Sequence, residues 1–159
     1  MSSGTPREKN DFKIVASNRK ARHEYEILES LEAGLALLGS EVKSLRDGKA
    51  SFKDAYATAK GNEIYLYNLH IAPYDKSGYA GHDPERPRKL LLHQKEIFRL
   101  ISSTEIKGLT LIPLRIYFRG KYAKVEIAIC RGKRVYDKRK AIADREMKRD
   151  MERQFKQNR

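Results

Sequence analysis

The 159-residue sequence predicts a mainly β protein: a small antiparallel barrel of about six strands, with two to three short flanking helices and a basic C-terminal tail. Three observations lead to this prediction. Apolar residues alternate with a period of two in several short segments. Few segments before residue 131 have helical spacing, and neither glycine nor proline occurs after Gly132. Many short antiparallel strands with few helices are typical of a small closed or partly open barrel.

Five segments predict strands. Turns at Gly61-Asn62 and at Arg119-Gly120-Lys121 each separate two of them, and the second pair alternates apolar and polar residues as a β-hairpin does. Pro113 has no N–H to donate, so we expect it at a strand edge or at a bulge. The five segments are 25–31, 52–60, 64–71, 112–118 and 125–129. We expect Gly34 to interrupt the first strand soon after residue 31.

Two short helices are predicted between the strands. Ser40 can cap a helix that runs through Glu41–Arg46, and Gly48 follows as a stop. A second helix is expected over His93–Ser103. The range 75–88 holds two glycines and two prolines, so it predicts a loop.

The chain divides into a flexible N-terminus over residues 1–11, a barrel over 12–131 and a tail over 132–159. From residue 131 to the end there are twelve Lys+Arg against five Asp+Glu. A lone helix with a narrow apolar stripe and so much charge is marginal in water. We therefore expect a tail that is disordered when free and helical when bound. Its apolar residues recur every four positions, at Ala143, Met147, Met151 and Phe155.

The net charge of +13 sets the class of partner. Such a surface attracts polyanions, with nucleic acid as the leading candidate and an anionic membrane surface as the lesser one. Cys130 is the only cysteine, so no internal disulfide can form. The sequence contains no run of eighteen apolar residues and its first ten residues do not resemble a secretory signal. We therefore expect a cytoplasmic protein.

Catalytic chemistry has little support in the sequence. The four histidines are scattered, and neither G-x-S-x-G nor a phosphate-binding glycine loop occurs. His82-Asp83 could be half of a metal site or an acid–base pair, although an Asx turn before Pro84 is favoured. Cys130 is favoured as a structural thiol over a nucleophile. The residues therefore do not support an enzyme, although they do not exclude one, and we expect no cofactor and no metal.

Basic clusters favour RNA as the partner. Asn18–His23 and Arg86–Lys89 each contain three cations, and Lys43 and Arg46 share one face of the first predicted helix. Dispersed cations on a rigid frame suit contacts to phosphates. The residues alone thus predict a basic β-barrel that binds structured RNA.

Seven motifs in series resemble the SmpB family, the SsrA-binding proteins of bacterial trans-translation. The similarity runs in order from about residue 12 to the C-terminus. The motifs are Asn18-Arg-Lys-Ala-Arg-His-Glu-Tyr25, Glu32-Ala-Gly-Leu35, Gly39-Ser-Glu-Val-Lys-Ser-Leu-Arg46, Arg88-Lys-Leu-Leu-Leu-His93, Lys107-Gly-Leu-Thr-Leu-Ile-Pro-Leu114, Lys124-Val-Glu126 and Gly132-Lys-Arg-Val-Tyr-Asp-Lys-Arg139.

This resemblance implies an OB-like barrel without enzymatic activity, which binds the tRNA-like domain of tmRNA and delivers it to stalled ribosomes. Elongation factor Tu would take part indirectly, through the charged tmRNA, and the tail would enter the decoding centre and the empty mRNA channel. We expect a monomer when the protein is free. The alternatives are a general structured-RNA-binding or ribosomal structural protein, and a metal-dependent nuclease that uses His82-Asp83.

The resemblance also implies the residues of an RNA face. Its cations suit phosphates, whereas Glu32 should accept a hydrogen bond from a base edge, a 2′-hydroxyl or an arginine that it orients. The alternative for Glu32 is a strand-end carboxylate paired with a surface cation. Leu91 could instead be a core leucine, and His23 a structural histidine. The implied RNA face comprises Asn18, Lys20, His23, Glu32, Lys43, Arg46, Lys89, Leu91 and Lys124.

In the tail, the segment 132–139 resembles a family motif in which Tyr136 would stack on a decoding-site base. The helix beyond it would lie in the mRNA channel, and a solubilising tail is the alternative. The segment Ser77–Pro84 departs from the family pattern, which puts RNA contacts there in doubt. The implied tail residues are Gly132, Lys133, Tyr136, Asp137, Lys138, Arg139, Met147 and Met151.

Overall fold

The computed structural model describes residues 12–74, 82–133 and 135–157, although the side chains of 135–144 and 157 lie outside the described set. The predicted flexible N-terminus (1–11) and the segment 77–81 also lie outside it. Within the described ranges the chain forms seven strands and four helices. In order they are β1 (Phe12–Ser17), α1 (Arg19–Glu24), β2 (Tyr25–Leu35), α2 (Gly39–Arg46), β3 (Ala50–Lys60), β4 (Glu63–Ile71), β5 (Arg88–Leu91), α3 (Gln94–Thr104), β6 (Leu109–Arg119), β7 (Tyr122–Gly132) and α4 (Val135–Gln157).

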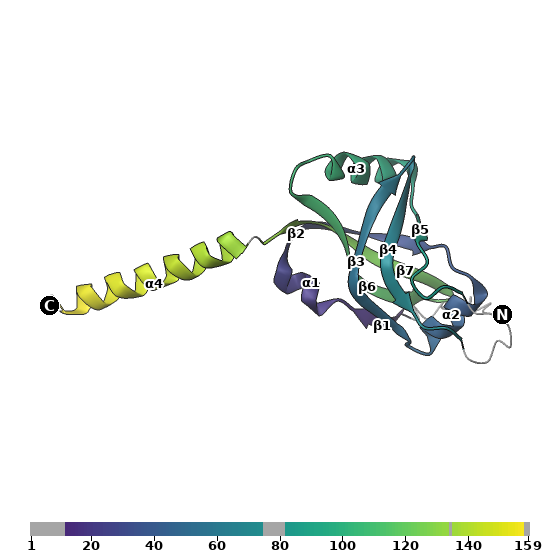
Figure 1. Cartoon of the computed structure of the whole chain (residues 1–159), viewed down its shortest axis with the longest axis horizontal. Coiled ribbons are helices and arrows are strands. Elements are labelled where there is room, and N and C mark those ends of the chain that lie inside the picture. Colours follow the sequence, from purple (N-terminus) through teal and green to yellow (C-terminus); the bar gives the residue numbers. More distant parts are fainter. Residues whose placement is uncertain (1–11, 75–81, 134, 158–159) are drawn as a thin grey trace, which may run out of the picture.

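Six antiparallel strands close into a barrel. The sheet has the order β1-β6-β3-β4-β5-β2-β7, and β6 also pairs with β7, so the ring runs from β6 through β3, β4, β5 and β2 to β7. Strand β1 lies outside this ring and pairs with β6. The predicted fold class is therefore confirmed, and the structure adds β1, β5 and α1 to the expected elements (Figure 1).

A bulge in β6 lets one strand serve two apolar clusters. Opposite β7 the register shifts between Pro113 and Arg115, which confirms the expectation for Pro113. Because a one-residue shift reverses the faces of a strand, Ile116 packs inside the barrel whereas Leu114 faces outward. The inner cluster includes Leu45, Ile64, Leu66, Leu69, Ile71, Leu90, Leu100, Leu111, Ile116, Ile127 and Ile129, and the outer cluster consists of Ala21, Ile112, Leu114, Ala128 and Cys130.

Helix α1 occupies the segment that the sequence predicted only as a basic cluster. The Asn18 side chain accepts from the N–H of Ala21, so it caps the helix, and its amide donates to the carbonyl of Pro113. Ala21 packs on the outer apolar cluster. Capping and packing therefore stabilise a helix of six residues that charge patterning alone does not predict.

Two local predictions were wrong. Strand β2 continues from Tyr25 through Gly34 to Leu35, because Gly34 pairs with strands on both of its sides. Helix α2 begins at Gly39, and its N-cap is Leu38 rather than Ser40. The Ser40 hydroxyl instead lies 2.9 Å from Nδ1 of His82. Gly48, at φ 71°, does follow the helix end as predicted.

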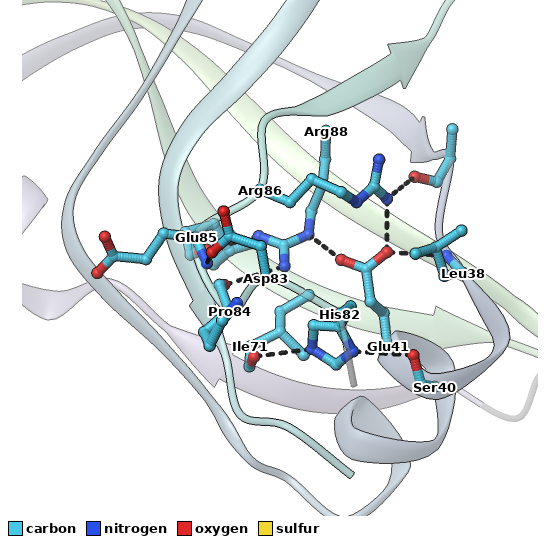
Figure 2. A network of polar contacts seen from close by, with 12 residues as sticks. Leu38, Ser40, Glu41, Ile71, His82, Asp83, Pro84, Glu85, Arg86 and Arg88 are labelled. Carbon is cyan, nitrogen blue, oxygen red and sulfur yellow. Dashed lines mark hydrogen bonds and ion pairs between the residues drawn. The ribbon is translucent and has the colours of Figure 1, made fainter. Parts of the chain in front are cut away.

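A buried ionic network attaches α2 to β5. The Glu41 carboxylate binds Arg86 and Arg88, each at 2.5 Å, and Arg88 also donates to the carbonyls of Leu69 and Pro84. Glu41 and Arg88 are completely buried. Figure 2 shows this carboxylate facing both guanidinium groups. Two cations of the basic cluster 86–89, Arg86 and Arg88, thus stabilise the fold. Alternation along β5 directs Arg88 into the protein and Lys89 outward.

Helix α4 extends away from the barrel, and residues 145–156 are exposed (Figure 1). It begins three residues after β7 ends. Among its described side chains, the large exposed apolar ones are Met147, Met151 and Phe155, at the predicted four-residue spacing. Folding of the tail on binding stays a prediction.

Candidate RNA interface

An open groove brings together three residues of the predicted RNA face. Gly34 in β2 pairs with Leu91 in β5 on one side and with Lys124 in β7 on the other. Glu32, two residues before Gly34, shares its face of the strand. The groove has a volume of about 440 Å³ and is lined by Glu32, Gly34, Leu91, Leu92, His93, Glu96 and Lys124.

Gly34 makes room for Leu91 at the floor of the groove. A Cβ at position 34 would lie 3.1 Å from the Cβ of Leu91. Leu91 is 52% exposed, so it is a surface residue and not the core leucine that was the alternative. An exposed leucine beside a lysine and a carboxylate can contact the apolar face of a ribose or base.

Glu32 is held by two neighbours on β6. The hydroxyl of Tyr117 donates to Oε2 of Glu32, and Nη2 of Arg119 lies 3.3 Å from the same oxygen. Burial raises the pKa of Tyr117, and the hydrogen bond to Glu32 and its negative charge raise it further. Arg119 is therefore the arginine expected beside Glu32, and it is also the surface cation of the alternative interpretation.

The α2 cations lie at the same end of the barrel as the groove. The Arg46 guanidinium carbon is 4.5 Å from the centre of the Phe118 ring, and Phe118 directly follows Tyr117. Nζ of Lys43 lies 5.4 Å from the centre of the Tyr74 ring. Both cations are exposed, and the rings position them. Lys89 is less free, because it pairs with Glu63 at 3.5 Å.

Three residues of the predicted RNA face, Asn18, Lys20 and His23, lie in or directly before α1, at the other end of the barrel. Tyr25, just after α1, pairs with Gly132, whereas Gly34 pairs with Lys124 at the far end of the same two strands. Lys20 lies 3.8 Å from Glu24 and 4.0 Å from Asp54, and His23 is exposed. Asn18 is buried, and its side chain is engaged in the contacts of α1.

The tail departs from this second end. The N–H of Lys133 donates to the carbonyl of Glu24 at 2.8 Å, so α1 fixes where the tail leaves the barrel. Lys133 is exposed and Gly132 half-buried. Met147 and Met151 are 62% and 64% exposed. The side chains of Tyr136, Asp137, Lys138 and Arg139 lie outside the described residues.

The two features considered for catalysis have structural roles. Oδ1 of Asp83 accepts from the N–H of Glu85 at 3.0 Å, which is the predicted Asx turn, and Nε2 of His82 lies 2.9 Å from the carbonyl oxygen of Ile71 (Figure 2). Burial raises the pKa of the Cys130 thiol to about 11. Among the described residues, no three His, Cys, Asp or Glu side chains gather as metal ligands would.

Sequence reasoning missed Tyr117, Arg119, His93 and Glu96 as neighbours of the predicted site. Tyr117 and Arg119 lie on β6, and their pairing with β7 at Lys124 and Tyr122 follows from the predicted hairpin. The hairpin register could therefore have placed Tyr117 next to Lys124. The contact of β6 with Glu32 could not be predicted in this way, because it also requires β2 to pair with β7.

Comparisons with known proteins agree with this architecture. The family model described as SmpB protein matches residues 15–157. An SsrA-binding protein of Syntrophomonas wolfei is 57% identical over 146 residues, which cover 92% of this chain and 93% of that protein. An SsrA-binding protein of Chloroflexus aggregans is 53% identical over 148 residues, covering 92% and 94%. These names describe binding and no chemical reaction.

A solved structure is also similar. One chain of "tmRNA-SmpB: a journey to the center of the bacterial ribosome" is 57% identical, with a TM-score of 0.64 over 76% of this chain and 85% of that chain. Within its described residues, this chain has no helix that is long and apolar enough to span a membrane. The family match extends from the first strand to the last turn of α4, and the chain belongs to the SmpB family of SsrA-binding proteins.

Proposed function

We propose that the chain is an RNA-binding adaptor without catalytic activity, which binds the tRNA-like domain of tmRNA and delivers it to stalled ribosomes. The family supports this partner, because the relatives are SsrA-binding proteins and the similar solved chain comes from a tmRNA–SmpB structure. The observation that carries the proposal is the groove in which Glu32, Leu91 and Lys124 meet.

The groove combines three kinds of contact to RNA. Lys124 attracts a phosphate, Leu91 offers an apolar surface, and Glu32 accepts a hydrogen bond. Lys43 and Arg46 extend the positive surface at the same end of the barrel. A purely electrostatic binder has no use for a carboxylate in such a groove, so Glu32 supports selective binding over general attraction.

The tail extends the proposal to the ribosome. It enters the decoding centre, where Tyr136 stacks on a base and Asp137, Lys138 and Arg139 contact ribosomal RNA. Helix α4 lies in the empty mRNA channel, with Met147 and Met151 on its apolar stripe. Elongation factor Tu associates through the charged tmRNA, and the free protein is a monomer.

A competition gel shift tests the RNA partner. The full chain is mixed with the tRNA-like domain of tmRNA at ~0.15 M salt, where loose phosphate contacts are partly screened. Elongator tRNA and duplex RNA of equal length compete in excess. Binding that survives both competitors supports the proposal. Equal loss to every competitor would instead identify a general structured-RNA-binding or ribosomal structural protein.

Glu32→Gln tests the role of the groove. This variant removes a negative charge from an RNA face, so general electrostatic attraction predicts tighter binding. The proposal predicts weaker binding to the tRNA-like domain, because the charged acceptor is lost. Glu29→Gln, which removes a carboxylate of similar exposure on the same strand from its ion pair with Arg99, is the matched control, and it should leave this affinity unchanged.

A further inference from the structure

Within the described part of the chain, the Glu32 carboxylate is held through one of its two oxygens. Tyr117 and Arg119 both bind Oε2. Among the described residues, none donates a hydrogen bond to Oε1 of Glu32. The Glu32 side chain is 33% exposed and lines the groove beside Leu91 and Lys124.

Tyr117 is fixed more firmly than a surface tyrosine. It is 3% exposed, its ring lies 4.7 Å from that of Phe12 between centres, and the Arg115 guanidinium lies 5.2 Å from the ring centre. It also pairs directly with Lys124 across the β6–β7 ladder. A ring held on these sides has little freedom, so its hydroxyl determines where Oε2 of Glu32 lies.

We propose that Tyr117 is a positioning residue which, with Arg119, holds Glu32 so that Oε1 accepts one hydrogen bond from a neutral donor of the bound RNA. The donor is a ribose 2′-hydroxyl or an exocyclic amine. This inference rests on the proposed function, because it assigns a chemistry to the same groove. A guanine that used both carboxylate oxygens is disfavoured, since Oε2 is already engaged.

Arg119 contributes to the same arrangement. Its charge lies beside that of Glu32 and offsets part of the repulsion between the carboxylate and incoming phosphates. Burial and the Glu32 hydrogen bond raise the pKa of Tyr117, so this phenol stays protonated and remains a donor at neutral pH. The three groups thus present a single acceptor of fixed direction next to the cation of Lys124.

A double-mutant cycle on the full chain tests the role of Tyr117. The variants are Tyr117→Phe, Glu32→Ala and their combination, measured for affinity to the tRNA-like domain of tmRNA and to elongator tRNA. Tyr117→Phe should weaken binding to the first RNA about threefold to tenfold, as for one lost hydrogen bond. In the Glu32→Ala background it should have no further effect. Additive losses, or no loss in the single variant, would overturn the proposal.

Two further variants keep this test informative. Tyr67→Phe is the matched control, because its ring stacks on Tyr56 and no described residue bonds its hydroxyl. Arg119→Met replaces Tyr117→Phe in the cycle if the latter unfolds the barrel. Because the Arg119 side chain is 57% exposed, its substitution should leave the barrel folded. A phosphate contact by Arg119 would persist in the Glu32→Ala background, and that result counts against the proposal. An effect of Arg119→Met that vanishes in that background supports it.

Modified RNA identifies the donor. The tRNA-like domain is made with 2′-deoxy substitutions in one short segment at a time, or with single bases replaced by analogues without the exocyclic amine. These analogues are inosine for guanosine, purine riboside for adenosine and pyrimidin-2-one riboside for cytidine. One modification should weaken wild-type binding and leave Glu32→Ala binding unchanged, which assigns the donor to ribose or base. If every modification affects both proteins equally, the proposal fails. Loss of selectivity in the wild-type protein itself would instead overturn the proposed function.

Discussion

At the scale of single residues, Gly34 is the position on which the shape of the groove depends. It lies between Leu91 and Lys124 in neighbouring strands, and a Cβ there would lie 3.1 Å from that of Leu91. Such a contact is tighter than ordinary packing, so Leu91 must shift by a few tenths of an ångström. The groove therefore requires a glycine for space and not for backbone conformation.

Gly34→Ala should weaken binding to the tRNA-like domain roughly fourfold, which corresponds to the loss of one buried methylene from the contact of Leu91 with RNA. The thermal midpoint should fall only slightly, because β2 keeps its ladder. Gly39→Ala is the control, since a Cβ at position 39 meets nothing within 4 Å. If both variants bind this RNA with equal affinity in a titration, Leu91 does not contact the RNA.

Residue roles were predicted with uneven success. Glu32, Leu91 and Lys124 were implied by the resemblance, and the structure places them in one groove. Strand alternation would have shown that Arg88 is buried, but only if the four residues of β5 had been recognised as a strand. Periodicity over four residues carries too little information for that, and the burial of a charge depends on a distant partner, Glu41.

At the scale of elements, the missed segments share a physical reason. Strands β1 and β5 are short, and their hydrogen-bond partners lie far away in the sequence, on β6 for the first and on β2 and β4 for the second. Helix α1 has six residues, four of them Arg, Lys or His. Long-range pairing and a buried cap stabilise these elements, whereas the longer strands and α3 carry their own apolar pattern.

The buried network between α2 and β5 should determine part of the acid stability. Burial by itself would raise the pKa of Glu41, but hydrogen bonds from Arg86, Leu38 and Arg88 outweigh it and hold the pKa below its ordinary 4.5. A group with a lowered pKa in the folded state stabilises fully above its unfolded pKa. This contribution is lost as the pH falls below 4.5 through the folded value.

Glu41→Gln should cost about 3–5 kcal/mol of unfolding free energy near pH 7, because it leaves the buried Arg88 guanidinium without its counter-charge. Urea titrations at several pH values measure the cost, and the difference from wild type should narrow below pH 4.5. The control is Glu63→Gln, whose ion pair with Lys89 is exposed. A difference that stays constant down to pH 3 would show that this carboxylate does not titrate as described.

Helix α4 should be required for a step other than RNA capture. Met147→Pro introduces a helix-breaking residue that costs roughly 3 kcal/mol in a helix interior, whereas Met147→Ala removes the same apolar side chain and keeps the helix. We expect both variants to bind the tRNA-like domain normally, and only the proline variant to lose most peptide tagging in a reconstituted trans-translation assay. Equal tagging by both would mean that the tail acts without forming this helix.

At the scale of the whole molecule, the groove and the start of the tail lie at opposite ends of the barrel. The groove and α2 lie where Gly34 pairs with Lys124, and α1 and the start of the tail lie where Tyr25 pairs with Gly132. In the proposed function, the strands of the barrel act as a spacer between the end that binds RNA and the end from which α4 extends (Figure 1). An adaptor that joins two large RNAs needs this separation so that neither partner blocks the other.

The net charge is divided between the tail and the rest of the chain. Removing residues 132–159 takes away eleven Lys+Arg and five Asp+Glu, and with them six of the thirteen net positive charges. Since non-specific attraction follows the number of phosphates neutralised, the truncated chain 1–131 should bind duplex RNA more weakly and with a shallower dependence on salt. Its selectivity should survive, because Glu32, Leu91 and Lys124 remain.

Affinities of the full and truncated chains, measured between ~0.05 and ~0.3 M salt, separate these two contributions. We expect a smaller logarithmic slope for duplex RNA after truncation. The ratio of affinities for the tRNA-like domain over duplex RNA should be unchanged or larger, and tagging should be lost. If the truncated chain instead loses its preference for the tRNA-like domain, the tail takes part in choosing the RNA. The barrel then could not be the sole source of selectivity, and the division of work between the two ends of the molecule would be wrong.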